Sequence, residues 1–165
     1  MFVGSVLLLL ALGILQYVRN LPTEPRLTWS IPKLEHVAMH IIPTSSRYKM
    51  GAEAWKHMLP SGGHVIRIEE ADGMITTHTV AMFHQLRCLE LLQQAYVDEG
   101  SHRTSELVQH CMNYLRQTVL CQMDMRTEIQ GSTFTHSGYD QMCNDWEVIY
   151  TEAEKNWEAY TQQKQ

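Results

Sequence analysis

Two stretches of helical periodicity in the middle of the chain limit most strongly what this sequence can fold into. In residues 79–97 apolar side chains recur at helical spacing, and the pattern ends before Gly100. A second pattern begins at a capping Thr104 or Ser105 and runs to about Met125. Because the connection is short, the two stretches predict an antiparallel helical hairpin.

The flanking segments complete the prediction of a mainly α fold, a small helical domain built around this central hairpin. Residues 52–58 are expected to form a short helix, residues 59–63 a turn and residues 65–68 a short strand. Residues 131–138 are expected to form a loop, and residues 145–162 a third, amphipathic helix. With 44% hydrophobic and 19% charged residues, the chain is too apolar to be disordered.

The N-terminal segment has the composition of a membrane anchor. Residues 2–18 carry no charge, and they lack the basic leader and small cleavage-site residues of a signal peptide. They therefore favour a single-pass transmembrane signal anchor over residues 1–19, whose orientation the few, mixed neighbouring charges leave open. Because such an anchor usually follows a cytosolic segment, the start of the sequence leaves room for a missing upstream exon.

Prolines and charge define the remaining organisation. Four prolines between residues 20 and 48 favour extended or turning backbone, so we expect a Pro-containing stem over residues 20–50 and one helical domain over residues 51–165. With 13 Lys+Arg against 18 Asp+Glu and no basic run, the chain is not expected to bind nucleic acid. Its expected partner through the anchor is the membrane.

The cysteines indicate a compartment. Cys88, Cys111, Cys121 and Cys143 all follow the apolar segment, and an even number is typical of a lumenal domain with two disulfides. We therefore expect structural disulfides, with the domain in the lumen of the secretory pathway; metal thiolates and catalytic thiols are the alternative. The pairing stays open, although Cys88 and Cys111 would then staple the hairpin region.

Two related pentads carry the candidate chemistry. His84, Arg87 and Cys88 share one face of the first predicted helix, and His110 and Cys111 repeat the last two positions on the second. Such a face can hold a metal, whereas the simpler alternative makes His84 and His110 partly buried, hydrogen-bonded helix residues. The sequence contains no phosphate-binding loop, serine elbow or CxxC pair, so oxidation is the catalytic class that its motifs support.

These motifs resemble the UstYa-like proteins of fungal peptide-mycotoxin biosynthesis, whose signature is two HxxHC motifs on consecutive helices. Residues 54–63 (AWKHMLPSGG) resemble that family's tryptophan and Pro-Gly segment, and residues 110–117 (HCMNYLRQ) resemble its HC-x-x-x-LRQ run. Residues 121–124 (CQMD) and 143–146 (CNDW) resemble its downstream cysteine segments. The resemblance covers residues 54–157, and the N-terminal anchor also fits it.

The resemblance implies an oxidase or oxygenase acting late in a secondary-metabolite pathway, including oxidative cyclisation of ribosomal peptides, with copper as cofactor. Its substrate would be a small-molecule or peptide intermediate. By this resemblance His84 and His110 would ligate copper, which can activate dioxygen. If the chain is catalytic, we expect Arg87 to position an anionic group of the substrate or oxidant. Cys88 and Cys111 would hold the scaffold.

The sequence also departs from the family pattern. Arg87 and Leu107 stand where motif histidines belong and cannot ligate a metal, and Gln141 replaces a histidine that often precedes the last cysteine. His84 and His110 would need completion by Cys88, Cys111 or another histidine, and His36 and His40 have the spacing of a helical pair. The other histidines are His36, His40, His57, His64, His78, His102 and His136.

These departures support two competing hypotheses. The chain could be a catalytically impaired, membrane-anchored partner subunit of an intact UstYa-like oxidase, in a homo- or hetero-oligomer formed through the helices around Leu107 and Trp146. In the other hypothesis the resemblance reflects the fold alone.

Overall fold

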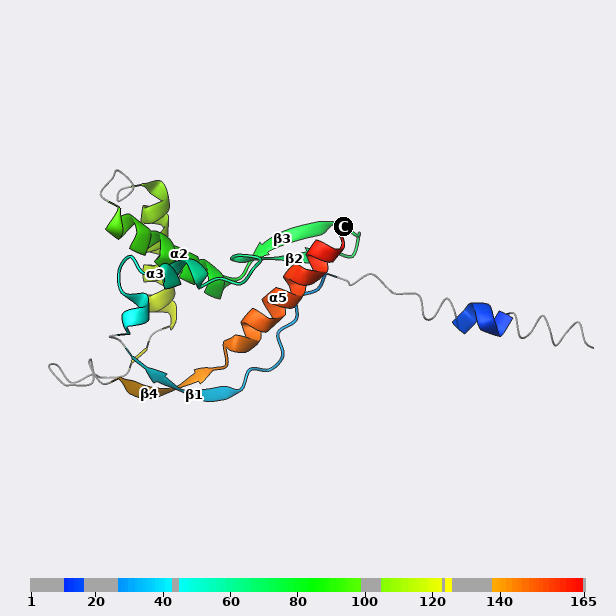
Figure 1. Cartoon of the computed structure of the whole chain (residues 1–165), viewed down its shortest axis with the longest axis horizontal. Coiled ribbons are helices and arrows are strands. Elements are labelled where there is room, and N and C mark those ends of the chain that lie inside the picture. Colours follow the sequence, from blue (N-terminus) through cyan, green and yellow to red (C-terminus); the bar gives the residue numbers. More distant parts are fainter. Residues whose placement is uncertain are drawn as a thin grey trace, which may run out of the picture.

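The computed structural model describes residues 11–16, 27–42, 45–98, 105–122, 124–125 and 138–164. Two helices, α2 and α3, lie together at one end of the molecule, and the long helix α5 leads from one two-stranded sheet towards the other (Figure 1). In chain order the elements are β1 (His36–Ile41), the 3-10 helices η1 (Ser46–Tyr48) and η2 (Glu53–His57), β2 (Val65–Glu69), β3 (Ile75–Thr79), α2 (Ala81–Val97), α3 (Glu106–Gln122), β4 (Tyr139–Asn144) and α5 (Glu147–Gln162).

The predicted helical hairpin is confirmed in α2 and α3. His84 on α2 stacks on Tyr114 of α3, whereas Cys88, further along α2, is bonded to Cys111, which comes earlier in α3. The contacts therefore run in opposite directions along the two helices, which makes them antiparallel. The first helix begins two residues later than its pattern predicts, because β3 continues to Thr79.

The prediction of a mainly α fold is incomplete, because two antiparallel sheets accompany the helices. β1 pairs with β4, with His36 opposite Asn144 and Ile41 opposite Tyr139. Because exposed and half-buried residues alternate along β1, His36 and His40 lie on the exposed face of a strand, and the helical His36–His40 pair is not formed. This pairing joins segments that are far apart in the sequence, so no local sequence pattern predicts it.

The second sheet is local and was partly predicted. The strand expected over residues 65–68 is present as β2, and β3 pairs with it, with Val65 opposite Thr79 and Glu69 opposite Ile75. The Val80 N–H donates a 3.1 Å hydrogen bond to the His64 carbonyl, so the start of β2 is tied to the start of α2. The hairpin β2–β3 therefore places His64 beside the helical hairpin.

Asn156 on α5 connects three segments through one buried side chain. It is 4% exposed, and its Oδ1 accepts a hydrogen bond from the Arg67 N–H at 2.8 Å. Its Nδ2 donates to the carbonyls of Arg67 at 2.7 Å and Thr28 at 3.1 Å. Next to it, the Glu69 N–H donates to the Leu27 carbonyl at 2.9 Å. The Asn156 amide and the Leu27–Thr28 segment together provide hydrogen-bond partners for the backbone groups at the outer edge of β2. Without them, these groups would need a further strand.

The predicted stem is integrated with the domain from Leu27 onward. Leu27 is fully buried, Thr28 is held by Asn156, and β1 pairs with β4. Apolar burial and backbone hydrogen bonds thus fix residues that the proline content alone would assign to a linker.

The third predicted helix is confirmed as α5, and it packs through an aromatic contact. Phe83 of α2 is fully buried against Tyr150 of α5 in an edge-to-face arrangement, with ring centroids 4.9 Å apart. The Tyr150 hydroxyl donates a 2.6 Å hydrogen bond to the Met58 carbonyl. Burial raises the pKa of Tyr150, so this hydroxyl stays protonated as a donor.

The segment predicted as an anchor, residues 1–19, lies mostly outside the described residues; residues 11–16 of it are helical. Within the ranges that the structure describes, no helix has the length and apolarity needed to cross a membrane. The loop expected over residues 131–138 also lies outside the described residues, apart from Gly138.

Replacing Asn156 with alanine should lower the free energy of unfolding by about 2–4 kcal/mol, because a buried N–H and two carbonyls lose their partner. Urea denaturation of the purified protein measures the change. Asn113→Ala, at an exposed position of α3, is the control and should change stability by less than about 0.5 kcal/mol. Equal losses in the two variants would contradict the role assigned to Asn156.

Candidate functional site

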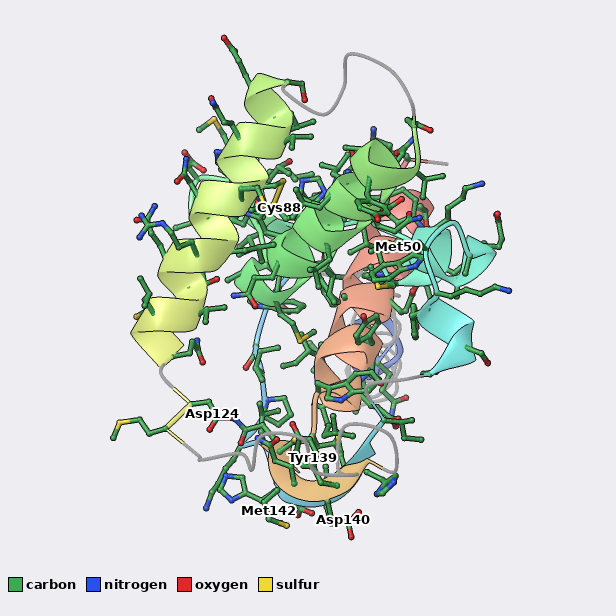
Figure 2. All side chains as sticks on the ribbon, turned by 90° about the vertical axis from the view of Figure 1, so that its left-hand side faces the viewer. Met50, Cys88, Asp124, Tyr139, Asp140 and Met142 are labelled. Atoms are coloured by element: carbon green, nitrogen blue, oxygen red, sulfur yellow. A yellow bond between two sulfur atoms is a disulfide. The ribbon has the colours of Figure 1, made fainter. Side chains whose placement is uncertain are left out.

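A disulfide joins the two helices of the hairpin where they pack together. Cys88 is bonded to Cys111, and the two residues are 0% and 1% exposed (Figure 2). Cys88 lies one helical turn after His84, and Cys111 directly follows His110, so the bond limits how far apart the two histidines can lie. The two sulfurs are no longer thiolates, which removes them from the metal ligands that the sequence leaves open.

His84 and His110 face each other across the hairpin. Their Nε2 atoms are 3.4 Å apart, whereas their ring centroids are 5.5 Å apart and the ring planes differ by 19°. The rings therefore present their Nε2 edges to each other. Two imidazole nitrogens bound to one ion each lie about 2.0–2.1 Å from it, so this separation is compatible with a shared ion.

Tyr114 forms an aromatic wall beside the pair. Its ring stacks on His84 with centroids 4.2 Å apart, and it is nearly parallel to the His110 ring at 6.2 Å. These contacts restrict the rotation of both imidazoles. Sequence reasoning did not select Tyr114 as a site residue, although its position four residues after His110 places it on the same face of α3.

A third imidazole approaches from the turn before β2. The ring centroid of His64 is 6.3 Å from that of His84. The pKa of His84 is lowered from 6.5, first by burial and then by the charges of His110 and His64. Because a lowered pKa keeps His84 neutral at pH 7, its ring is in the form that can ligate a metal. The sequence contains seven further histidines that could complete a metal site, and of these the fold brings His64 close to the pair.

The remaining described histidines lie elsewhere on the surface. Three of them are beside carboxylates, at 2.6 Å for His40 with Asp140, 3.8 Å for His57 with Glu53 and 3.6 Å for His78 with Glu70. His36 lies on the exposed face of β1, and His102 and His136 lie outside the described residues.

The donor set at the histidine pair is small. Among the residues that the structure describes, no group of three or more His, Cys, Asp or Glu side chains could hold a metal ion. Cys121 is exposed and Cys143 is half-buried, and neither forms a disulfide in the described part of the chain. From the described residues, an ion between His84 and His110 would therefore take these two imidazoles.

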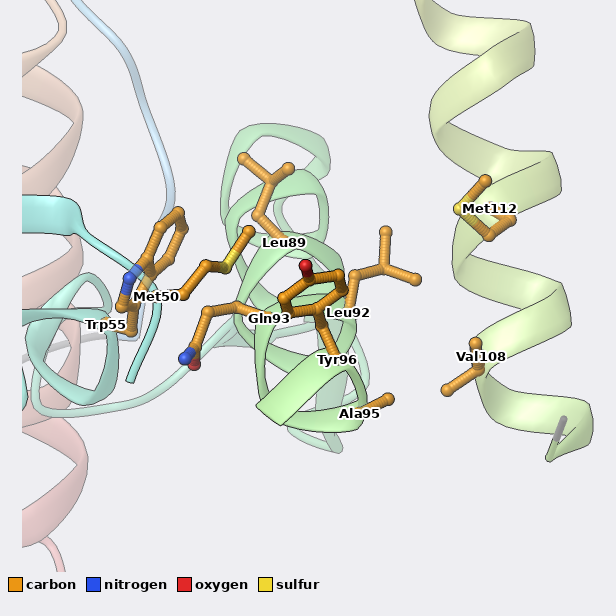
Figure 3. A pocket seen from close by; sticks show the side chains of 9 residues that line it. All are labelled: Met50, Trp55, Leu89, Leu92, Gln93, Ala95, Tyr96, Val108 and Met112. Carbon is orange, nitrogen blue, oxygen red and sulfur yellow. The ribbon is translucent and has the colours of Figure 1, made fainter. Parts of the chain in front are cut away.

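An apolar groove lies apart from the histidine pair. It has a volume of about 410 Å³ and follows the outer face of α2, between the η1–η2 segment and α3 (Figure 3). Met50 and Trp55 line one side, Leu92 and Tyr96 project from α2, and Met112 lies on α3. None of its described lining residues is a histidine.

The comparison with known protein families identifies the family of this chain. The family described as "Mycotoxin biosynthesis protein UstYa" matches residues 28–162, from the segment held by Asn156 to the end of α5. The chain belongs to the UstYa family. The match confirms the resemblance that the pentads and cysteine segments indicate in the sequence.

Curated relatives of this UstYa family member are named as oxidases and a hydroxylase. The UstYa family oxidase phomYb of Diaporthe leptostromiformis is 29% identical over 118 residues, which cover 59% of this chain and 47% of the relative. The oxidase ustYa of Aspergillus flavus is 28% identical over 88 residues, covering 47% and 40%. The hydroxylase cctR of Talaromyces islandicus is 29% identical over 89 residues, covering 49% and 34%. The chain therefore spans less than half the length of these relatives, and no solved structure matches it significantly.

The positions that depart from the UstYa motifs have ordinary structural contacts. The Arg87 Nη1 lies 2.6 Å from Oε2 of Glu90, one turn further along α2, and this carboxylate side chain is only 13% exposed. Leu107 is 53% exposed on α3, and Gln141 lies on β4 opposite Met39. Glu90 therefore balances the charge of Arg87, and a role for Arg87 in binding an anionic group stays a prediction.

In the metal-free protein, an NMR titration should give His84 a pKa below 6.5, and His110→Ala should raise it, because that change removes a positively charged neighbour. The control His57→Ala, at an exposed position of η2 beside Glu53, should leave the His84 pKa unchanged. Because the folded state binds fewer protons at His84 than the unfolded state, its contribution to stability is complete above about pH 6.5 and is lost as the pH falls through the folded pKa. A His84 pKa at or above 6.5 would refute the arrangement described here.

Proposed function

We propose that this chain is a copper-dependent oxidase of a fungal secondary-metabolite pathway, acting on a small-molecule or peptide intermediate, with oxidative cyclisation as one form of its chemistry. The names of its relatives, which are oxidases and a hydroxylase, support the reaction class. The observation that carries the proposal is the 3.4 Å separation of the Nε2 atoms of His84 and His110.

Copper fits the donors that are present. Neutral imidazole nitrogens are ligands that copper favours, and the two Nε2 atoms are close enough to share one ion. Arg87 and Leu107, in the positions of the missing motif histidines, add no donor, so His84 and His110 are the ligands that the motif positions offer. Bound copper would supply one-electron redox steps and reaction with dioxygen.

Residues around the pair have distinct roles in this proposal. The disulfide between Cys88 and Cys111 holds the two helices, and Tyr114 keeps the imidazole rings oriented. His64 lies beside His84, where it can accept a proton released by the substrate group that is oxidised. Arg87 can orient an anionic group of the substrate or oxidant only if it leaves Glu90.

The compartment is part of the same proposal. A disulfide bond persists in an oxidising lumen, so the Cys88–Cys111 bond supports a domain on the secretory route. Anchoring by the apolar segment over residues 1–19, in a single pass, completes this placement.

A second candidate function is that of a catalytically impaired partner subunit for an intact UstYa-like oxidase. The exposed apolar surface favours it: Leu107 is 53% exposed and Trp146 is 43% exposed, and the groove beside α2 adds Tyr96 at 65%. Aromatic side chains such as Trp146 and Tyr96 are enriched in the cores of protein interfaces.

Metal analysis of the purified protein, after copper loading and dialysis, tests the first proposal. The native protein should retain about one copper ion per chain, and His84→Ala/His110→Ala should retain almost none, because both ligands are lost. A matched double variant of exposed histidines, His36→Ala/His57→Ala, should retain as much copper as the native protein.

If the native protein retains no copper, or if the two double variants lose it equally, the histidine pair is not the copper site. The partner-subunit function would then be favoured by co-purification with an intact HxxHC protein and by loss of that association in Leu107→Asp.

A further inference from the structure

Tyr114 is in ring contact with the histidine pair. Its ring stacks on His84 with centroids 4.2 Å apart and an interplanar angle of 24°. The same ring lies 6.2 Å from the His110 centroid and is within 6° of parallel to it. Tyr114 is half-buried, and its helix α3 is joined to α2 by the Cys88–Cys111 bond. A phenol ring is therefore held against the pair in a defined orientation.

The stacking itself does not require a tyrosine. An aromatic face is enough to restrict the two imidazoles, and phenylalanine would supply it equally well. The hydroxyl group adds a different property, because a phenol can lose one electron and one proton together to give a neutral radical. The chemistry of the Tyr114 hydroxyl is thus separate from the packing role of the ring.

The oxidation proposed above removes electrons in pairs. Forming a carbonyl, a double bond or a new ring takes two electrons and two protons from the substrate. The 3.4 Å between the Nε2 atoms of His84 and His110 fits one metal ion, and copper exchanges electrons singly. A redox-active side chain beside the pair can carry the other electron.

Tyr114 is the side chain placed for this task. The sulfurs of Cys88 and Cys111 are already joined in a disulfide, so they have no thiol to oxidise. The imidazoles of His84 and His110 are assigned as ligands. Tyr114 touches both of these rings, and its half-exposed position allows its proton to pass to and from water.

We propose that Tyr114 cycles between a phenol and a neutral tyrosyl radical and so carries one of the two oxidising equivalents, a role that rests on the function proposed above. The O–H bond of Tyr114 breaks as the radical forms, and its electron and proton are delivered to dioxygen. The bond forms again when the radical removes a hydrogen atom from the substrate. Bound copper would supply the other one-electron step, so the substrate loses two electrons and two protons, which convert dioxygen to hydrogen peroxide.

Rapid-mixing absorption spectroscopy of the copper-loaded protein tests this role, with hexachloroiridate(IV) as a one-electron oxidant and no substrate present. The native protein should consume about one oxidising equivalent per chain more than Tyr114→Phe, and it should show the absorption band of a tyrosyl radical. Tyr114→Phe should lack the band and retain as much copper as the native protein, because phenylalanine keeps a ring against His84.

Tyr96→Phe is the matched control, because it removes the same hydroxyl from a tyrosine that is 65% exposed on α2, and it should give the native band. A native protein that retains copper but shows no band, or an equal band in Tyr114→Phe, would overturn the role of Tyr114 alone. Equal loss of the band in Tyr96→Phe would overturn its assignment to Tyr114. A native protein that retains no copper would instead contradict the proposed function, and the redox role of Tyr114 with it.

Discussion

The disulfide between Cys88 and Cys111 is the constraint on which the candidate site depends. Among the described elements, α3 packs extensively only against α2, so this bond and the side chains around it determine how the two helices meet. The cysteines are 23 positions apart, and closing a loop of that size stabilises the folded chain by about 3 kcal/mol in the chain-entropy model. The bond lies within one turn of both His84 and His110, which limits their separation.

The other half of the molecule depends on Asn156. Its side-chain amide forms hydrogen bonds with the backbone of Arg67 at the edge of β2. The same amide also holds the segment that begins at Leu27, through the Thr28 carbonyl. The strand that it fixes, β2, begins directly after His64 and has Arg67 in its middle. One buried side chain on α5 therefore helps to fix where the third imidazole lies relative to the helical hairpin.

The parts of the fold that could be predicted are those with a local pattern. Helical periodicity predicted α2, α3 and α5, a short apolar run predicted β2, and the pentad spacing selected His84 and His110. The pairing of β1 with β4 was missed because its two strands are far apart in the sequence, and His64 was not distinguished from six other histidines for the same reason. The spacing of Tyr114 from His110 could have placed it on the same helix face. Its stacking on His84 could not be predicted in this way, because His84 lies on the other helix. The transmembrane anchor and copper stay predictions.

The site keeps one histidine from each of the two motifs typical of the UstYa family, and those two lie opposite each other. Pulsed electron paramagnetic resonance of the copper-loaded protein tests this account most directly, because it counts the imidazoles bound to the metal. The account predicts two coordinated imidazoles in the native protein and one in His84→Ala or His110→Ala. Spectra that are the same in the native protein and in both variants would contradict it.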